Sequence, residues 1–191
     1  WDEKLFRMLA NKISFFDRFA VTGDDLEYIP QEVHSVVLCG HNRMGYSIYK
    51  ALKKMKKSVL IVDFNPQVIK HLVKQKVPCI YGDVGDGEIL ERVDLKNKEM
   101  VISTIYDIKD NILLIRKAKE ANKKALVFVT ARESADALTL YEEGADYVIL
   151  PHHLGGEHVS ILLEDFTKNI NSVIQTKMRH IDNLRKMPML G

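Results

Sequence analysis

The sequence predicts an α/β fold, a Rossmann-like doubly wound parallel six-stranded sheet with an N-terminal amphipathic arm and a long C-terminal helix. Short runs of Val, Ile and Leu without polar alternation recur along the chain, which is typical of strands buried on both faces. Segments with helical spacing lie between these runs. Strands that alternate with helices in this way indicate βαβ units and a parallel sheet.

Composition supports an ordinary globular protein. The 191 residues are 46% hydrophobic and 28% charged, with a net charge of +2. This balance argues against a sequence-independent nucleic-acid binder, so no nucleic-acid partner is expected. No apolar run reaches the roughly 18 residues of a membrane span.

Six apolar runs are predicted to be strands: residues 33–39, 58–62, 78–81, 100–104, 125–130 and 147–150. Asn65 and Pro66 predict the start of a helix over residues 67–75, and Asp86 is expected to cap a helix over residues 88–93. Two later helices are indicated by apolar positions, namely Ile112, Leu113, Ile115 and Ala118 in one, and Leu138, Leu140 and Tyr141 in the other.

Three regions follow from this pattern: an N-terminal arm and linker over residues 1–30, the Rossmann-like domain over residues 31–151, and a C-terminal helix and tail over residues 152–191. Apolar stripes predict helices in both flanking regions, the last one over residues 157–184. So long a helix cannot pack entirely on so small a sheet, so part of it is expected to pack against another chain or domain. For the helix of the N-terminal arm, packing on its own domain is one possible arrangement.

The segment after the first strand is similar to the dinucleotide fingerprint G-x-G-x-x-G between a strand and a helix. Gly40 would make the tight turn, and Gly45 would let the helix pack close to the strand. Asn42 replaces the middle glycine and crowds the place where a pyrophosphate would approach, which favours a mononucleotide. The alternative is that both glycines serve only as turn residues.

Three polar residues end later strands, where an open parallel sheet binds its ligands. Asp63 stands where a carboxylate accepts hydrogen bonds from a ribose diol, and its charge would repel a 2′-phosphate, so NADP is disfavoured. Asp83 and Thr104 are placed to meet an adenine or ribose and a phosphate, respectively. Capping of the following turns is the alternative role for both.

Other polar clusters predict no site. Cys39 and Cys79 are expected to be small buried thiols in a reducing compartment. A group of acidic and histidine residues near the start of the last helix matches no standard zinc spacing, so no metal site is predicted; it comprises His152, His153, Glu157 and His158. Five lysines crowd one helix and its end, either as a solvated face or for an acidic partner: Lys50, Lys53, Lys54, Lys56 and Lys57.

Taken together, the motifs over residues 33–157 resemble the TrkA-N domain, also called KTN or RCK, the regulator of potassium conductance. The motifs that carry the resemblance are, in order, residues 40–45, Asp63, Gly82-Asp83, Thr104 with Asn111, and Gly144-Ala145-Asp146 with Val148 and Pro151. Residues 149–158 are most similar to the versions fused to Kef-type monovalent cation/proton antiporters.

This resemblance implies a regulatory domain on the cytoplasmic side of the cell membrane. It implies a homodimer or higher ring through the C-terminal helix, and binding of NAD(H) or an adenine mononucleotide, AMP or ATP. By that binding the domain would gate a membrane-embedded potassium or other monovalent cation channel, or a cation/proton antiporter. The cofactor-binding residues it implies are Gly40, His41, Asn42, Arg43, Met44, Gly45, Asp63, Phe64, Asp83, Val84, Thr104 and Arg132.

Individual roles follow from the same resemblance. Residues 40–45 would line the phosphate loop, Asp63 would hold the adenosine ribose, and Asp83 with Val84 would face the adenine side. Thr104 would lie in the far phosphate region, and Arg132 would face the ligand.

Two alternatives remain, an NAD-dependent oxidoreductase and a structural dimerisation domain with a degenerate nucleotide site. An oxidoreductase needs a substrate pocket and a general acid or base beside the nicotinamide. The residues after the last predicted strand indicate only one helix and a tail, so no catalytic residue is predicted.

Overall fold

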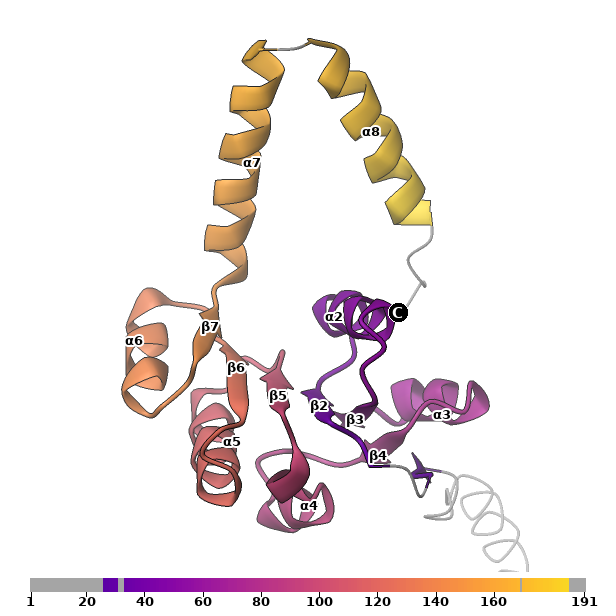
Figure 1. The fold of residues 1–191 in the computed structure, drawn as a ribbon, viewed down its shortest axis with the longest axis vertical. Helices are drawn as coiled ribbons and strands as arrows, with labels where there is room; N and C mark the ends of the chain where they lie inside the picture. The colour runs from indigo at the N-terminus through magenta and orange to yellow at the C-terminus, as the bar shows by residue number, and fades with distance from the viewer. Residues whose placement is uncertain (1–25, 31–32, 169, 186–191) are drawn as a thin grey trace, which may run out of the picture.

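The computed structural model describes residues 26–30, 33–168 and 170–185; the predicted amphipathic arm lies outside them. Seven strands form one sheet in the order β1-β4-β3-β2-β5-β6-β7 (Figure 1). The strands are β1 (Glu27–Tyr28), β2 (Val36–Cys39), β3 (Val59–Asp63), β4 (Cys79–Tyr81), β5 (Met100–Ser103), β6 (Leu126–Thr130) and β7 (Tyr147–Ile149).

The six predicted strands are confirmed, and all pair in parallel. The count of six is wrong by one, because β1 pairs antiparallel with β4 in a segment predicted to be a linker. Two residues are too few to form a recognisable apolar run, and β1 exists because β4 offers a free edge. The strand order places β2 and β5 side by side, which is the topological switch point of a doubly wound sheet.

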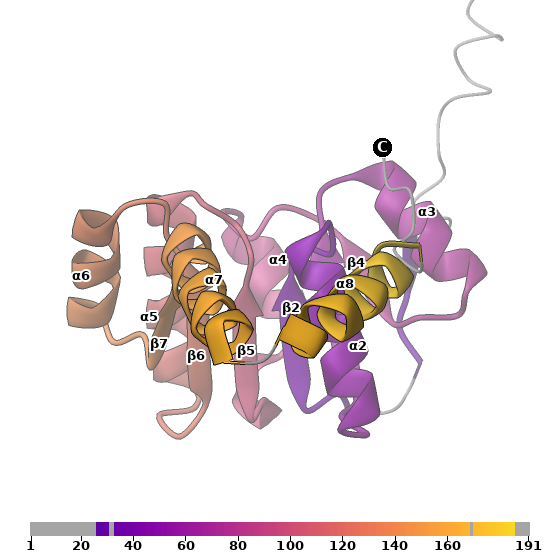
Figure 2. The ribbon, with the colours of Figure 1, turned by 90° about the horizontal axis from the view of Figure 1, so that it is seen from above.

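Helices cover both faces of the sheet (Figure 2). Successive residues of β2 point to opposite faces, so Val36 and Leu38 join one buried cluster while Val37 and Cys39 join the other. The first cluster is covered by α2 (Met44–Lys54) and α3 (Pro66–Lys74). The second is covered by α4 (Gly87–Arg92), the short η2 (Leu95–Asn97), α5 (Ile108–Ala121) and α6 (Ser134–Glu142).

The predicted caps begin their helices. Asn65 Oδ1 accepts a hydrogen bond from the Gln67 backbone N–H at 2.9 Å, and Asp86 Oδ1 does the same for Glu88. Each bond satisfies one N–H group that has no partner within the helix.

Two of the three apolar positions that indicated α6 from the sequence do not face the core. Leu138 is 66% and Tyr141 44% exposed, whereas Ala137 and Leu140 are buried. Residues 137 and 140 are three apart and share a helix face, while residue 138 is turned by about 100° from residue 137.

The predicted long C-terminal helix is present as two helices, α7 (Pro151–Lys168) and α8 (Ile170–Arg185). The helical region also begins earlier than residue 157, with Pro151 at its first position, which suits proline. The two helices contact each other; α7 leads away from the sheet after β7, and α8 turns back toward α2 (Figure 1). Across the described residues, no helix combines the length and the apolar character that crossing a bilayer requires.

Candidate functional site

The turn after β2 holds two glycines in close contact. Gly40 adopts φ +84°, and a Cβ there would lie 2.4 Å from Thr104 Oγ1. A Cβ on Gly45 would lie 2.0 Å from the Gly40 carbonyl oxygen. Gly40 therefore makes the tight turn and Gly45 allows the close approach of α2 to β2, as the sequence predicts.

Asn42 and Arg43 shape the loop between these glycines. The Asn42 Oδ1 atom accepts a hydrogen bond from the Arg43 N–H at 2.9 Å. Arg43 precedes α2 and has φ 33°, a region that side chains other than glycine rarely occupy. The fingerprint's middle glycine is thus replaced by a residue whose side chain binds its own loop.

Asp63 is the most constrained carboxylate of this edge. It is buried at the end of β3, where Oδ2 accepts the His41 N–H at 2.8 Å and Oδ1 accepts the Asn65 N–H at 2.8 Å. Each oxygen keeps a further acceptor position. The carboxylate is therefore held between the glycine loop and the start of α3, ready to accept from a ligand hydroxyl.

Thr104 holds the other side of the switch point. Its hydroxyl lies 3.2 Å from the Cys39 carbonyl oxygen and 3.1 Å from that of Gly40, to which it donates. Nearby, the Asn111 amide donates to the carbonyls of Ile105 and Thr130 and so ties the ends of β5 and β6 together. Thr104 therefore offers a ligand its acceptor positions rather than its proton.

A cavity of about 680 Å³ opens at the carboxyl ends of four parallel strands, between these groups. Its lining residues are Gly40, Asn42, Asp63, Phe64, Asn65, Val68, Thr104, Ile105, Tyr106, Asp107, Ile108, Arg132 and Asp136. This volume is within the range of small-molecule sites, which span about 300–1,000 Å³.

The charged groups of the cavity are one cation and three carboxylates. The Arg132 guanidinium carbon stands 5.0 Å from the centre of the Tyr106 ring, which orients the side chain by a cation–π contact. Asp63, Asp107 and Asp136 supply the negative charge. Among the described lining residues, Arg132 is thus the cation available to a phosphate.

The structure brings half of the predicted cofactor-binding residues to this cavity: Gly40, Asn42, Asp63, Phe64, Thr104 and Arg132. The other six do not line it: His41, Arg43, Met44, Gly45, Asp83 and Val84. Val84 is 1% exposed and packs in the core, so in this conformation its side chain offers no surface to a ligand. The Asp83 carboxylate accepts the Gly85 N–H at 3.0 Å outside the cavity.

His41 contributes its backbone rather than its ring. The ring is 4% exposed and packs edge-on against Tyr46 and Tyr49, with centroids 5.8 and 5.4 Å away. Burial lowers the pKa of the imidazole, and the charge of His71 adds to this, while Asp63 opposes it. The Nε2 atom has no hydrogen-bond partner.

Sequence reasoning missed several lining residues, among them Tyr106, Asp107 and Asp136. Tyr106 and Asp107 lie within three residues after Thr104, so the rule that selected Thr104 at a strand end also covers them. Asp136 lies in the first turn of α6, where the helix dipole favours an acidic residue in any case, so its position in the sequence does not indicate the cavity.

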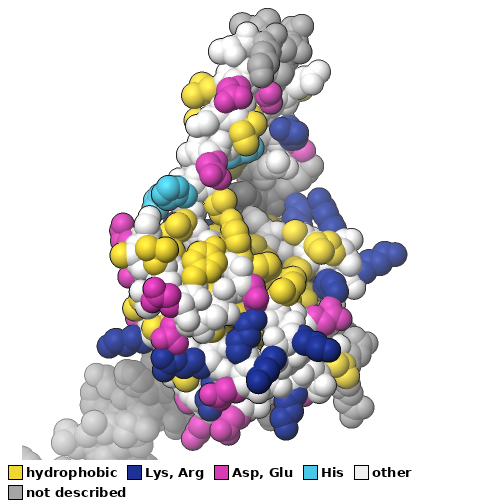
Figure 3. Space-filling view, turned by 60° about the vertical axis from the view of Figure 1, so that its left-hand side comes forward, with side chains coloured by type: hydrophobic (Ala, Val, Ile, Leu, Met, Phe, Trp, Pro, Cys, Tyr) yellow, Lys and Arg dark blue, Asp and Glu magenta, His cyan; other side chains and the backbone are white. Residues whose placement is uncertain are grey.

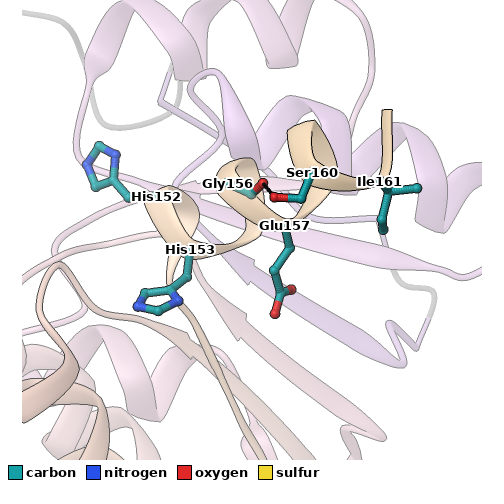
Figure 4. Close-up of a pocket in the computed structure, with 6 residues that line it drawn as sticks. All are labelled: His152, His153, Gly156, Glu157, Ser160 and Ile161. Atoms are coloured by element: carbon teal, nitrogen blue, oxygen red, sulfur yellow. Dashed lines mark hydrogen bonds between the residues drawn. The ribbon is translucent and has the colours of Figure 1, made fainter. Parts of the chain in front are cut away.

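A second hollow, of about 690 Å³, lies along α7, and its described lining residues all belong to that helix (Figure 4). His152 and His153 are adjacent in the helix and point to different sides, while His153 and Glu157 share one side. Within the described residues, no group of three or more His, Cys, Asp or Glu is placed to hold a metal ion.

Comparison with known proteins identifies relatives of the sheet domain. The sequence profile of a family described as the TrkA-N domain matches residues 36–151. A probable potassium channel protein of Methanocaldococcus jannaschii is 26% identical over 123 residues, and the glutathione-regulated potassium-efflux protein KefC of Escherichia coli is 24% identical over 122 residues. These matches cover 63% and 64% of this chain, but only 36% and 20% of the relatives.

Solved structures share the fold. The TrkA-N domain of the Escherichia coli inner membrane protein ybaL matches 70% of this chain and 99% of its own, with TM-score 0.65 and 17% identity. A Kef C-terminal domain of Shewanella denitrificans in AMP-bound form matches 78% of this chain and 91% of its own, with TM-score 0.60 and 15% identity. The GsuK channel bound to NAD matches 71% of this chain and 24% of its own, with TM-score 0.57 and 18% identity.

Proposed function

The chain belongs to the TrkA-N domain family, and from this premise we propose that it is a nucleotide-sensing regulatory domain of a monovalent cation transport system. Potassium is the first candidate ion, in a channel or a cation/proton antiporter, because the relatives include a potassium channel and a potassium-efflux protein. The chain spans about a third or less of those relatives, so the ion and the transporter are part of the proposal.

The observation that carries the proposal is the geometry of Asp63. Two backbone N–H groups hold its carboxylate at the switch point, beside the Gly40 turn and the N-terminus of α2. A fixed carboxylate next to a glycine turn suits the ribose and phosphate of one nucleotide.

We propose NAD(H) or AMP as the preferred ligand. Kef and GsuK structures that share the fold contain AMP and NAD, respectively. The cavity's three carboxylates and single arginine favour ligands of low negative charge, which disfavours ATP. The charge of Asp63 disfavours the 2′-phosphate of NADP.

Regulation then requires two arrangements of the domain that bind the nucleotide with different affinity, since a ligand shifts an equilibrium only through that difference. A bound nucleotide would bias the attached or partner gate in this way. The proposal assigns the domain a sensing rather than a catalytic role, because its named relatives are transport proteins.

A homodimer or ring through α7 and α8 is part of the same proposal. Both helices expose apolar side chains over their length, including Val159, Leu163, Ile174 and Met178. Further hydrophobic side chains gather around the base of α7 (Figure 3). A second copy of the chain would bury this surface at a two-fold axis.

We propose the cytoplasmic side of the membrane as the location. Cys39 and Cys79 are both free thiols buried in the sheet, which suits a reducing compartment.

Thermal unfolding with NAD, NADH, NADP, AMP, ADP and ATP tests the ligand proposal. A ligand at 100 times its dissociation constant adds about 2.7 kcal/mol to the free energy of unfolding, which raises the melting temperature by roughly 5–10 °C for a chain of this size. NAD(H) or AMP should give the largest shift, and NADP a small one.

Asp63→Ala should abolish the shift, whereas Glu142→Ala, at an exposed carboxylate on α6, should leave it unchanged. A folded wild-type protein that responds to none of the six nucleotides would contradict the proposed function. An unchanged response of the Asp63 variant would contradict the proposed site.

A further inference from the structure

The end of the sheet at which β3 and β4 begin lies opposite the cavity. It carries a group of lysines in the turns that lead into these two strands. We call it the basic edge; it comprises Lys53, Lys54, Lys56, Lys57, Lys74 and Lys76. The strands β3 and β4 are hydrogen-bonded neighbours, so the two turns lie side by side. All of these lysines except the half-buried Lys57 are exposed.

Helix dipoles explain only part of this group. Lys53, Lys54 and Lys74 lie in the last turns of α2 and α3, where a cation is favoured. Lys56 and Lys76 lie beyond those helix ends with φ 57° and 55°. Glycine is less strained in that left-handed conformation, so both positions keep a positive charge at a cost in stability.

Two strongly exposed apolar side chains stand at the same edge. Met55, between the lysines, is 63% exposed, and Val33 is 75% exposed. The segment that holds Val33 lies beside the α2–β3 turn, because the Val36 N–H donates to the Ser58 carbonyl at 3.0 Å. The basic edge thus combines lysines with apolar side chains.

The charges near β3 and β4 differ between the two strand ends, while Glu99 and Asp146, which precede β5 and β7, add acidic residues farther along the basic end of the sheet. Lys57 pairs with Glu99 at 2.5 Å at the margin of the basic edge. The opposite end of the strands carries the cavity's carboxylates, Asp63, Asp107 and Asp136. A negatively charged surface therefore attracts the basic edge and repels the carboxylates of the cavity.

We propose that the basic edge docks on the surface of an anionic lipid bilayer, with Met55 and Val33 at the headgroup level and the cavity facing away. The proposal rests on the proposed function, which places the domain beside a membrane protein. Lysines that alternate with exposed apolar side chains match the two components of a lipid interface, anionic headgroups and acyl chains. A segment made only of acidic residues would use the charges but not the exposed Met55.

Vesicle sedimentation of the full chain tests this, with phosphatidylcholine vesicles that contain or lack phosphatidylglycerol. The wild-type protein should bind only the anionic vesicles, and less as salt rises. Each lysine near such a surface contributes about fivefold to the partition coefficient. A variant with Lys53→Gln, Lys54→Gln and Lys56→Gln should therefore bind about 100-fold more weakly.

A matched variant with Lys109→Gln, Lys117→Gln and Lys177→Gln loses the same charge from exposed positions on α5 and α8, outside the basic edge. Its vesicle binding should fall much less. The pair Lys56→Gly and Lys76→Gly separates folding from binding, because glycine suits the left-handed turns. It should unfold at an equal or higher temperature and bind about 25-fold more weakly.

Three results would overturn the proposal: no wild-type binding to anionic vesicles, equal losses in the two triple variants, or binding to soluble polyglutamate but not to vesicles. Nucleotide-dependent thermal shifts of the same variants report on the proposed function separately. They should be unchanged, because none of these lysines lines the cavity.

Discussion

Asp63 shows how one residue acquires its role from its backbone neighbours. The N–H groups of His41 and Asn65 hold its two oxygens, so in the proposed role the carboxylate would accept from a ribose without losing side-chain entropy on binding. Strand β3 ends at Asp63, and the glycine loop after β2 provides the N–H donor of His41.

Gly45 should tolerate no side chain. In Gly45→Ala the Cβ would lie 2.0 Å from the Gly40 carbonyl, so the backbone must shift. We expect the free energy of unfolding to fall by about 3 kcal/mol, measured by urea denaturation. Gly155→Ala is the control: its Cβ meets nothing within 4 Å, and alanine should raise the stability by about 0.5–1 kcal/mol. Equal effects would contradict the close contact at Gly45.

His41 should make stability depend on pH. Its folded-state pKa is lowered from the ordinary value of 6.5, chiefly by burial. The fold therefore favours the neutral ring, so this contribution is complete above the unfolded pKa and is lost as pH falls below it toward the folded pKa.

Urea denaturation at pH values from about 7.5 down to 5.5 measures this loss, since an unfolded histidine titrates near 6.5. His41→Phe, which keeps a ring between Tyr46 and Tyr49, should flatten the dependence. His153→Gln, at an exposed site on α7, should leave it intact. A wild-type protein whose stability is constant over this range would contradict the buried neutral ring.

At the scale of elements, the residue that caps α5 also lines the cavity. Asp107 Oδ1 caps it by accepting the N–H groups of Lys109 and Asp110 at 2.8 and 3.2 Å, and the same carboxylate lines the cavity. The helix thus begins on a charge that would repel a phosphate.

Two variants of Asp107 should separate these effects. Asp107→Asn keeps a good cap and removes the charge, so stability should stay nearly constant while the affinity for AMP rises. Asp107→Ala should lose about 1 kcal/mol of stability as well. Urea denaturation and AMP titration calorimetry measure the two quantities. A weaker AMP affinity in Asp107→Asn would instead make this carboxylate a ligand contact.

At the scale of the whole molecule, the core does not depend on the C-terminal helices. Leu150 is the last residue of the chain that packs against the buried clusters, within the part that the structure describes. Helices α7 and α8 contact each other and expose most of their side chains.

A chain that ends at Leu150 should therefore unfold cooperatively within a few degrees of the full chain and keep its nucleotide response. It should also be monomeric, because the proposed dimer surface is removed. Analytical ultracentrifugation and thermal unfolding measure both. A truncated chain that remains dimeric would place the interface on the sheet domain, and one that fails to fold would show that α7 supports the core.

Much of the site could be predicted because its signals are local. Gly40 and Asp63 follow apolar strands directly, and strand ends of a parallel sheet meet at one edge. Leu138 and the division into α7 and α8 could not be predicted so well. Apolar positions in α6 allow more than one face, and no Pro or Gly separates residues 157 and 184.

The sequence by itself determined the six parallel strands, the glycine turn and the carboxylate that follows β3, since each depends on residues close together in the chain. Only the tertiary structure decided which side chains share the cavity. Arg132 and Asp136 line the same cavity as Asp63 because the strand order places β6 next to β5 at the same end of the sheet, and Val84 turns into the core because apolar burial outweighs its position next to a strand end. Such contacts join distant segments, and no local pattern encodes them.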